Sequence, residues 1–385
     1  EALVSSPSVA GKLSFFPQLE TAPDGGYTEA SINTLVSVLV IPLAVQWWSV
    51  WYPSAEPGGG GYVAQRMLAA KDERHARAAV LLFNAAYYGV RPWPWIIVAL
   101  CSVIVFPDLQ SIAAAFPDVD RAIINDDLAY PAMLKAVLPP GWLGLVVASL
   151  LAAYISTIST HLNWGSSYVV HDFYGRFVRP ESGERERVLA GRLSIVVMMI
   201  AAGFIALNLS NALRAFEILL QIGAGTGLLF ILRWFWWRIN AVSEVVAMVV
   251  SFAVAVAFEV FEPALAAWQQ LVIGVAVTTA CWVTATLLTK PADGETLRSF
   301  CRRINPGGPG WRPVYRQLQQ AGYCFDNEAV NIPRGIVCMW LGCLSVYALL
   351  FATGSWLYGQ PVAATLLAAV AILSAFGIVK LRFNH

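Results

Sequence analysis

The stretch Leu150-Leu151-Ala152-Ala153-Tyr154-Ile155-Ser156-Thr157-Ile158-Ser159-Thr160-His161 decides how the chain folds. It brings five hydroxyl groups and one imidazole into an apolar run, Trp142 to Val170, that is long enough to cross a bilayer as a helix. On a helix, Ala153, Ser156 and Thr157 share one face because three and four residues separate them. Two hydroxyls and the Ala153 carbonyl would offer a hard cation such as sodium three oxygen ligands. Further ligands must then come from another segment.

The same spacing has a second interpretation. Ser and Thr in membrane helices often donate a hydrogen bond to the carbonyl one turn earlier, and small residues let two helices approach closely. Spacing alone favours this packing role over an ion site.

The composition is that of a polytopic membrane protein. Hydrophobic residues make up 58% of the 385 residues and charged residues only 13%, whereas about a quarter of the residues of soluble domains are charged. A net charge of +1 and the lack of a basic tail give no sign of nucleic-acid binding. The six cysteines have no spacing typical of a disulfide framework or a zinc site. No nucleophile, base and orienting group gather on one side of the membrane, so we expect no enzyme.

Apolar segments predict an all-α membrane protein with about nine transmembrane helices. They are 32–52, 78–106, 142–170, 188–209, 212–235, 241–258, 271–288, 336–358 and 363–379. Lys and Arg occupy every second loop, which places the N-terminus outside and the C-terminus in the cytoplasm of a cell inner (plasma) membrane. We expect an extracellular stretch at 1–30, five core helices at 31–240 and four accessory helices at 241–385, with a cytoplasmic loop at 289–334. A start at Glu1 and an odd number of spans indicate an N-terminal truncation.

Several motifs resemble the sodium:solute symporter family. The run Ala-x-x-Ser-Thr-x-Ser-Thr from Ala153, followed by Asn-Trp-Gly-Ser-Ser-Tyr at 163–168 and Asp-Phe-Tyr at 172–174, is similar to the family's eighth core helix. Further similar motifs are the Trp-rich segment 47–52, Gln-Arg-Met-Leu-Ala-Ala-Lys at 65–71, Asp-x-Ala-Tyr-Pro at 127–131, the Gly-rich span at 223–227 and Pro-Gly-Gly-Pro-Gly at 306–310. The resemblance implies a LeuT-like fold, here the second inverted repeat plus C-terminal accessory helices.

The resemblance also implies a function. Family members are sodium-coupled symporters that move a small solute across the lipid bilayer by alternating access. In the family, the positions matching Ala153, Ser156 and Thr157 hold Na+, and carbonyls of a first core helix complete the site. That helix would belong to missing N-terminal helices of the same protein. His161 could couple proton movement to this transport, although a neutral ring that donates to a nearby carbonyl is the simpler role.

The implied solute pocket draws on three helices, and its candidate residues are Gln46, Trp47, Trp48, Trp51, Asn84, Tyr87 and Gln221. Indole rings can stack on rings and cations, but Trp51 could equally belong to an aromatic belt at the membrane interface. A bond between helices would satisfy Asn84 as well as a solute would. Glu217, one turn before Gln221, is a carboxylate in a membrane helix and so a further functional candidate, with Arg214 as its possible ion-pair partner.

Nucleotide binding and sensing without transport are two other functions to compare with this one. Gly58 to Gly61 lacks the Lys-Ser/Thr of a P-loop and follows no strand, so nucleotide binding is disfavoured; a helix broken at membrane depth instead indicates a transport site. The alternative function is a transporter-like membrane sensor or partner-binding module without transport. Uptake against a gradient would distinguish the two. The sequence leaves the solute undetermined.

Overall fold

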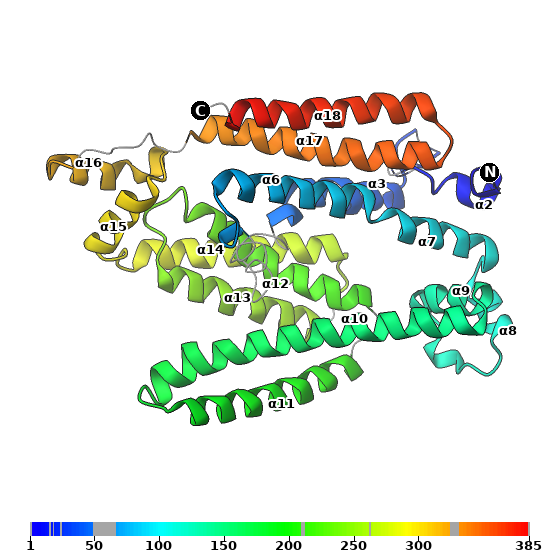
Figure 1. Cartoon of the computed structure of the whole chain (residues 1–385), viewed down its shortest axis with the longest axis horizontal. Coiled ribbons are helices and arrows are strands. Elements are labelled where there is room, and N and C mark those ends of the chain that lie inside the picture. Colours follow the sequence, from blue (N-terminus) through cyan, green and yellow to red (C-terminus); the bar gives the residue numbers. More distant parts are fainter. Residues whose placement is uncertain are drawn as a thin grey trace. The chain divides into compact units, whose positions relative to one another are not determined.

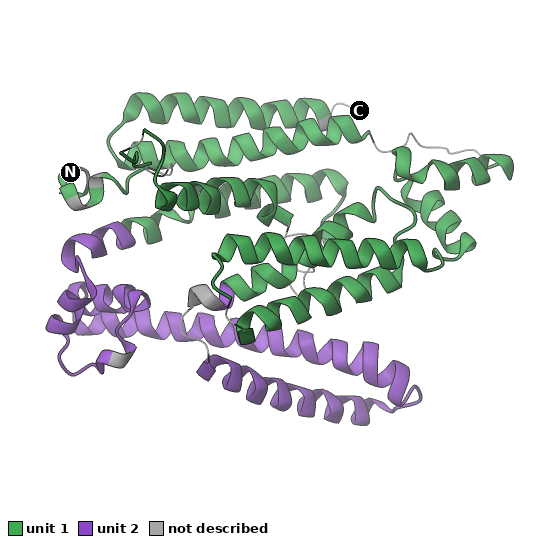
Figure 2. Cartoon of the chain, turned by 180° about the vertical axis from the view of Figure 1, so that it is seen from behind, with its two compact units in different colours: residues 1–97, 217–385 green, residues 98–216 purple. Residues whose placement is uncertain are grey.

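The computed structural model of the chain describes residues 2–14, 17, 19–23, 25–48, 67–208, 212–261, 263–323 and 331–383. Within these ranges the regular secondary structure is helical, apart from one isolated bridge between Thr21 and Tyr27. The backbone divides into two compact units (Figure 2), one formed by residues 1–97 with 217–385 and the other by residues 98–216.

The described residues contain 8 helical segments that are long and apolar enough to span a membrane (Figure 1). They are Glu73–Val105, Pro140–Val178, Glu184–Asn208, Ala215–Leu232, Ala241–Phe261, Ala267–Leu288, Ile332–Leu357 and Pro361–Leu381. Each coincides with an expected span. The first expected span, 32–52, corresponds in the described residues to a shorter apolar helix, Glu29–Ala44. The chain is therefore a multi-pass membrane protein built from α-helices, as the sequence predicts.

The N-terminal part of the first unit consists of short elements followed by one long broken helix. Its elements are α1 (Ala2–Ser5), α2 (Pro7–Ala10), α3 (Glu29–Leu35), η1 (Val36–Val40), α4 (Ile41–Ala44), η2 (Gln46–Trp48), α6 (Glu73–Asn84), η3 (Ala85–Val90) and α7 (Trp93–Val105). Asp72 caps α6 by accepting from the His75 amide at 2.8 Å. The helix is interrupted at Pro92, because η3 ends at Val90 and α7 begins at Trp93 after a turn.

Trp93 anchors that break. Its side chain is 3% exposed, and its indole Nε1 donates to the Leu350 carbonyl at 3.1 Å. The ring fills the space where Gly354 lacks a side chain. The indole thus fixes the kinked helix against α17 (Ile332–Leu357).

The second unit contains a long helix pair. Its elements are α8 (Leu109–Ala115), η4 (Arg121–Ile123), η5 (Asp126–Leu128), α9 (Ala129–Val137), α10 (Pro140–Ser167), η6 (Tyr168–Val178) and α11 (Glu184–Asn208). A proline in the first turn starts α10, where a missing amide proton costs nothing. The helix continues as the π-helical η6 and then turns back into α11, so α10 and α11 lie side by side (Figure 1).

The rest of the first unit is a packed bundle. Its elements are α12 (Ala212–Leu232), α13 (Ala241–Phe261), α14 (Ala267–Leu288), α15 (Gly294–Ile304), η7 (Pro309–Trp311), α16 (Arg312–Gln320), α17 and α18 (Pro361–Phe383). Small residues at intervals of four, Ser243, Ala247, Ser251 and Ala255, form the buried stripe of α13. Such stripes let helix backbones approach closely in a membrane.

The connection expected to be a polar loop at 289–334 contains two amphipathic helices, α15 and α16. Their shared interior is formed by Cys301, Trp311, Val314 and Leu318. The Trp311 indole donates to the Trp234 carbonyl at 2.9 Å, which ties this α15–α16 module (residues 294–320) to the end of α12. A sequence signal existed: Asp293 caps α15, and apolar residues follow at helical spacing.

Candidate functional site

The three residues predicted to bind Na+ lie on one face of α10, in the second unit. The Thr157 hydroxyl donates to the Ala153 carbonyl at 2.9 Å, and Thr160 repeats the pattern by donating to the Ser156 carbonyl at 2.8 Å. This is the back-bonding expected of Ser and Thr in membrane helices. Each hydroxyl that donates its proton still has lone pairs for a cation, so back-bonding and ion binding are compatible. The ligation of Na+ stays a prediction.

The oxygen atoms on this face are neutral. Ala153, Ser156 and Thr157 are all exposed within their helix pair. Among the described residues, no three His, Cys, Asp or Glu side chains gather as ligands for a metal ion. Neutral hydroxyl and carbonyl oxygens suit a hard, singly charged ion that has to be released again. The donor set is therefore chemically compatible with Na+.

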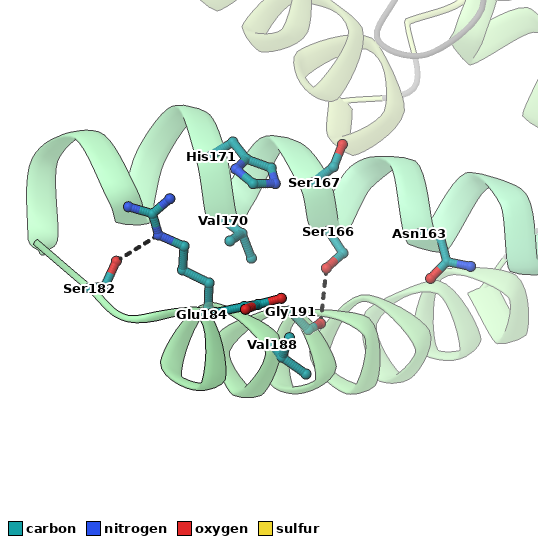
Figure 3. Close-up of a pocket in the computed structure, with 10 residues that line it drawn as sticks. Asn163, Ser166, Ser167, Val170, His171, Ser182, Glu184, Val188 and Gly191 are labelled. Atoms are coloured by element: carbon teal, nitrogen blue, oxygen red, sulfur yellow. Dashed lines mark hydrogen bonds between the residues drawn. The ribbon is translucent and has the colours of Figure 1, made fainter. Parts of the chain in front are cut away.

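A polar track continues from this face toward η6. Ser156, Asn163 and Ser167 are separated by seven and four residues, so they share one side of the helix. Asn163 and Ser167 line a pocket with a volume of about 490 Å³ between the end of α10, η6 and the first turns of α11 (Figure 3). The hydroxyl face and this pocket thus lie along the same helix.

Charged side chains also line the pocket. His171 from η6, with Glu184 and Arg187 from α11, lines it. Arg187 is held in place because its Nε donates to Ser182 at 3.0 Å (Figure 3) and its second terminal nitrogen donates to the Pro180 carbonyl at 3.3 Å. The pocket therefore contains both signs of charge and neutral hydroxyls, an environment that can solvate an ion.

Close helix packing forms the pocket floor. The Ser166 hydroxyl donates to the Gly191 carbonyl at 3.0 Å, and a side-chain carbon on Gly191 would lie 3.2 Å from that hydroxyl. Sequence reasoning did not single out these two residues or Glu184 and Arg187. Their proximity arises from the turn between η6 and α11, and no spacing within one helix reveals it.

The predicted solute residues of η2 lie against the Gly-rich part of α12, in the first unit. The Trp48 indole donates to the Ala224 carbonyl at 3.0 Å. The Trp48 carbonyl occupies the space beside Gly227 that any side chain would fill. Trp47 is 55% exposed and meets the Trp48 ring edge to face at 5.3 Å. Gln46 is half-buried, and Trp51 lies outside the described residues.

Gln221 faces another helix of the same unit. It is 9% exposed, and its amide occupies the space left by the missing side chain of Gly274 on α14. In this conformation the Gln221 amide packs against α14. Glu217, one turn earlier, is half-buried, and the side chain of Arg214 lies outside the described part. The solute-lining role of Gln221 stays a prediction.

The remaining candidates belong to the broken helix of α6 and η3. The Asn84 amide donates to the Val80 carbonyl at 2.8 Å, so its own helix supplies a partner. Tyr87 stacks on Phe83 at 5.0 Å and lies 4.3 Å from the Arg91 guanidinium. Tyr87 and Asn84 occur in the first unit, whereas the Na+ candidates occur in the second.

The profile of the sodium:solute symporter family matches residues 56–251, which is more than half of the 385 residues. The chain belongs to the sodium:solute symporter family. The matched range contains α10, α11 and the pocket, together with Asn84, Tyr87 and Gln221. It begins after Gln46, Trp47, Trp48 and Trp51, so the family match does not extend to those four solute candidates.

Individual relatives within the family are cotransporters. Sodium/myo-inositol cotransporter 2 of Mus musculus is 27% identical over 205 residues, which cover 50% of this chain and 29% of the relative. A sodium/glucose cotransporter of Vibrio parahaemolyticus is 29% identical, with 50% and 37% covered. A sodium/mannose cotransporter of Bos taurus is 31% identical, with 46% and 31% covered. The aligned part spans only 29% to 37% of these relatives. The family comprises carriers and not enzymes, in agreement with the sequence prediction.

Proposed function

We propose that this chain is part of a sodium-coupled symporter that moves a small solute by alternating access. One observation carries the proposal: a bilayer-spanning helix of a symporter family member presents the Ala153 carbonyl and the Ser156 and Thr157 hydroxyls on one face. Polar atoms at membrane depth are costly and therefore mark transport sites. The relatives are named as cotransporters, which favours transport over a sensor without transport.

The Na+ site needs more than this face. Three oxygens from one helix leave an ion incompletely coordinated, so the remaining ligands come from another helix. In the LeuT-like arrangement that the family resemblance implies, residues 31–240 form the second inverted repeat and residues 241–385 the accessory helices. The carbonyls of a first core helix, preceding this repeat in the same protein, then close the site. Sodium thus bridges two repeats and couples its own binding to the outward-facing state.

The membrane potential determines the direction in which sodium moves. Lys and Arg lie in alternate loops, which supports a plasma-membrane protein with a cytoplasmic C-terminus. In this orientation the end of α10 and η6 face the cytoplasm. Sodium leaves the hydroxyl face along Asn163 and Ser167 and enters the pocket lined by His171. About 2.3 kcal/mol per charge per 100 mV is available to drive this release.

The solute is a small polyhydroxylated molecule. The relatives are named for myo-inositol, glucose and mannose, which share a ring bearing several hydroxyls. Aromatic rings that stack on such rings and amides that bond to hydroxyls suit this class. Trp47, Tyr87 and Gln221 offer these groups, and further lining residues come from the other repeat.

The test is uptake by the intact protein in cells, with myo-inositol, glucose and mannose as labelled solutes in sodium or choline medium. We expect Ser156→Ala combined with Thr157→Ala to abolish sodium-dependent uptake, because two of the three oxygens are removed. The matched control is Thr284→Ala on α14, whose hydroxyl likewise donates to the carbonyl one turn earlier, that of Ala280 at 2.7 Å; it should leave uptake unchanged. Sodium-dependent uptake at the normal level in the double variant would refute the assignment.

A further inference from the structure

Arg91 is a charged side chain at membrane depth. It lies within the candidate span Glu73–Val105, and it is the only charged residue between Arg77 and Asp108. The uncharged stretch at 78–90 before it and the 13-residue helix α7 after it each rise about 20 Å as helix. The hydrocarbon core of a bilayer is about 30 Å thick. Arg91 therefore lies inside the hydrocarbon layer, away from both head-group layers.

The backbone and two aromatic rings fix the position of Arg91. Its amide donates to the Ala86 carbonyl at 3.0 Å, which is the pairing of a π-helix, a form frequently found at functional sites. Its guanidinium carbon lies 4.3 Å from the centre of the Tyr87 ring and 4.9 Å from that of the Trp95 ring. Both rings attract the positive charge through their π-electrons. The three side chains thus form one cluster at the bend between α6 and α7 (Figure 1).

The rings leave the hydrogen-bond donors of Arg91 unused. A guanidinium carries five N–H donors and no acceptor. In the part of the chain that the structure describes, the Arg91 side chain makes no hydrogen bond or ion pair, and it is exposed. Because a charge facing lipid at this depth is costly, such side chains almost always face a protein interior or a water-filled cavity. The donors of Arg91 are therefore available to a ligand that enters such a cavity.

We propose that Arg91 binds a carboxylate of the transported solute, which is then a polyhydroxylated acid, that is, a sugar acid. This rests on the proposed function and narrows its solute class. A carboxylate matches Arg91 because it accepts two parallel, charge-assisted hydrogen bonds from one guanidinium. Tyr87, whose ring Arg91 covers, is itself one of the predicted solute residues. A neutral sugar would leave the charge of Arg91 without a counter-charge.

Glucose and glucuronate are a matched pair of solutes, because they differ at one carbon, which is a hydroxymethyl group in glucose and a carboxylate in glucuronate. The intact protein is purified in detergent, and equilibrium binding of labelled glucuronate is measured in sodium medium with glucose or alanine as competitor. We expect glucuronate to bind at least about tenfold more tightly than glucose, the factor for one hydrogen bond to a charged group. Alanine, a carboxylate without the hydroxyls, should compete more weakly than glucuronate.

Substitutions assign the preference to Arg91. Arg91→Gln should weaken glucuronate binding at least about tenfold and leave glucose binding nearly unchanged. Arg91→Lys, a second variant in case the first fails to fold, should retain part of the preference, because an ammonium keeps the charge but lacks the planar fork. The matched control is Arg303→Gln, which changes an exposed arginine on α15 outside the candidate spans and should leave the affinities for both solutes intact.

Three results would overturn the inference. One is equal affinity of the unsubstituted protein for glucose and glucuronate, which would mean that a carboxylate of the intact protein already pairs with Arg91. The others are equal competition by alanine and glucuronate, and an equal loss of both sugars in Arg91→Gln. Sodium-dependent glucose uptake without a preference for glucuronate would refute this inference but not the proposed symport. Preferential glucuronate binding without sodium-dependent uptake would refute the symport but not this inference.

Discussion

The α10–α11 pair and the α12–α14 bundle are similarly apolar, but their residues are buried to different extents. In the most apolar windows of α10 and α11, 0% of the residues are buried, whereas 50% of the α12 window is buried. The bundle encloses Leu229 and Trp282, which are 0% and 1% exposed. Apolar composition therefore predicts membrane insertion but not packing. The bundle carries its own packing partners, while α10 leaves its hydroxyl face exposed.

The largest expected difference concerns tryptophan. Trp311 is 3% exposed within the α15–α16 module, whereas Trp142 at the start of α10 is 63% exposed. Trp311→Ala should lower the free energy of unfolding by about 3–5 kcal/mol through cavity formation. Trp142→Ala should change it by less than about 0.5 kcal/mol. Denaturant unfolding in detergent measures both, and similar losses would mean that the start of α10 is as tightly packed as the α15–α16 module.

The thiol of Cys301 provides a second test of how tightly the α15–α16 module is packed. Burial raises the pKa of the Cys301 thiol to about 11 from an ordinary 9.0, so its thiolate fraction at pH 8 should be about 100-fold below that of an exposed thiol. The fold favours the neutral thiol, so this stabilisation is complete below pH 9.0 and declines as the pH rises through about 11. Alkylation rates measure the effect. Trp311→Ala should accelerate alkylation of Cys301; an unchanged rate would mean that the module does not shield it.

The next largest difference in stability is expected between alanine substitutions of two glycines. The Trp48 carbonyl occupies the side-chain space of Gly227, whereas Gly144 on α10 has no atom within 4 Å of that position. Gly227→Ala should therefore cost about 1–3 kcal/mol of stability through overpacking. Gly144→Ala should stabilise by about 0.4–1 kcal/mol by restricting the unfolded chain. Melting in detergent compares the two, and the same sign for both would remove the distinction between the regions.

The smallest difference is expected at two asparagines. Asn240 is 8% exposed and joins α13 to the end of α14 by donating to Thr289 at 2.9 Å and to the Lys290 carbonyl at 3.0 Å. Asn240→Ala should cost about 1–2 kcal/mol, because buried acceptors lose their donor. Exposed Asn163 should tolerate alanine without loss of stability, although sodium-dependent uptake should fall. A stability loss at Asn163 instead would assign it a packing role.

Much of the fold could be predicted because the hydropathy of a membrane helix depends only on its own residues and not on its neighbours in space. The span expected at 241–258 is found at Ala241–Phe261, and that at 363–379 at Pro361–Leu381. The starts were less predictable, because Asp72 and Asn331 cap helices whose first turns contain charged residues. The α15–α16 module was missed for a related reason: its buried side chains are spaced among arginines, so its mean hydropathy resembles that of a loop.

Less of the site was predictable. Helix periodicity was enough to place Ala153, Ser156 and Thr157 on one face, because that property belongs to a single helix. Whether Trp48 and Gln221 line a solute or pack against glycines depends on neighbouring helices, which spacing does not encode. The pocket at Ser166 and Gly191 joins two residues that are 25 positions apart in the sequence, and such contacts arise only in three dimensions.

The π-helical segment η6, which follows α10, forms one wall of the pocket. Over Tyr168–Val178 the amides pair with carbonyls one residue farther back than in an α-helix. Rewinding any turn of η6 to α-helical pairing would lengthen the helix and rotate His171 relative to the fixed Arg187. Such rewinding exchanges one hydrogen bond for another and breaks none outright. A small shift of η6 along its own axis would therefore widen or narrow the pocket that it lines.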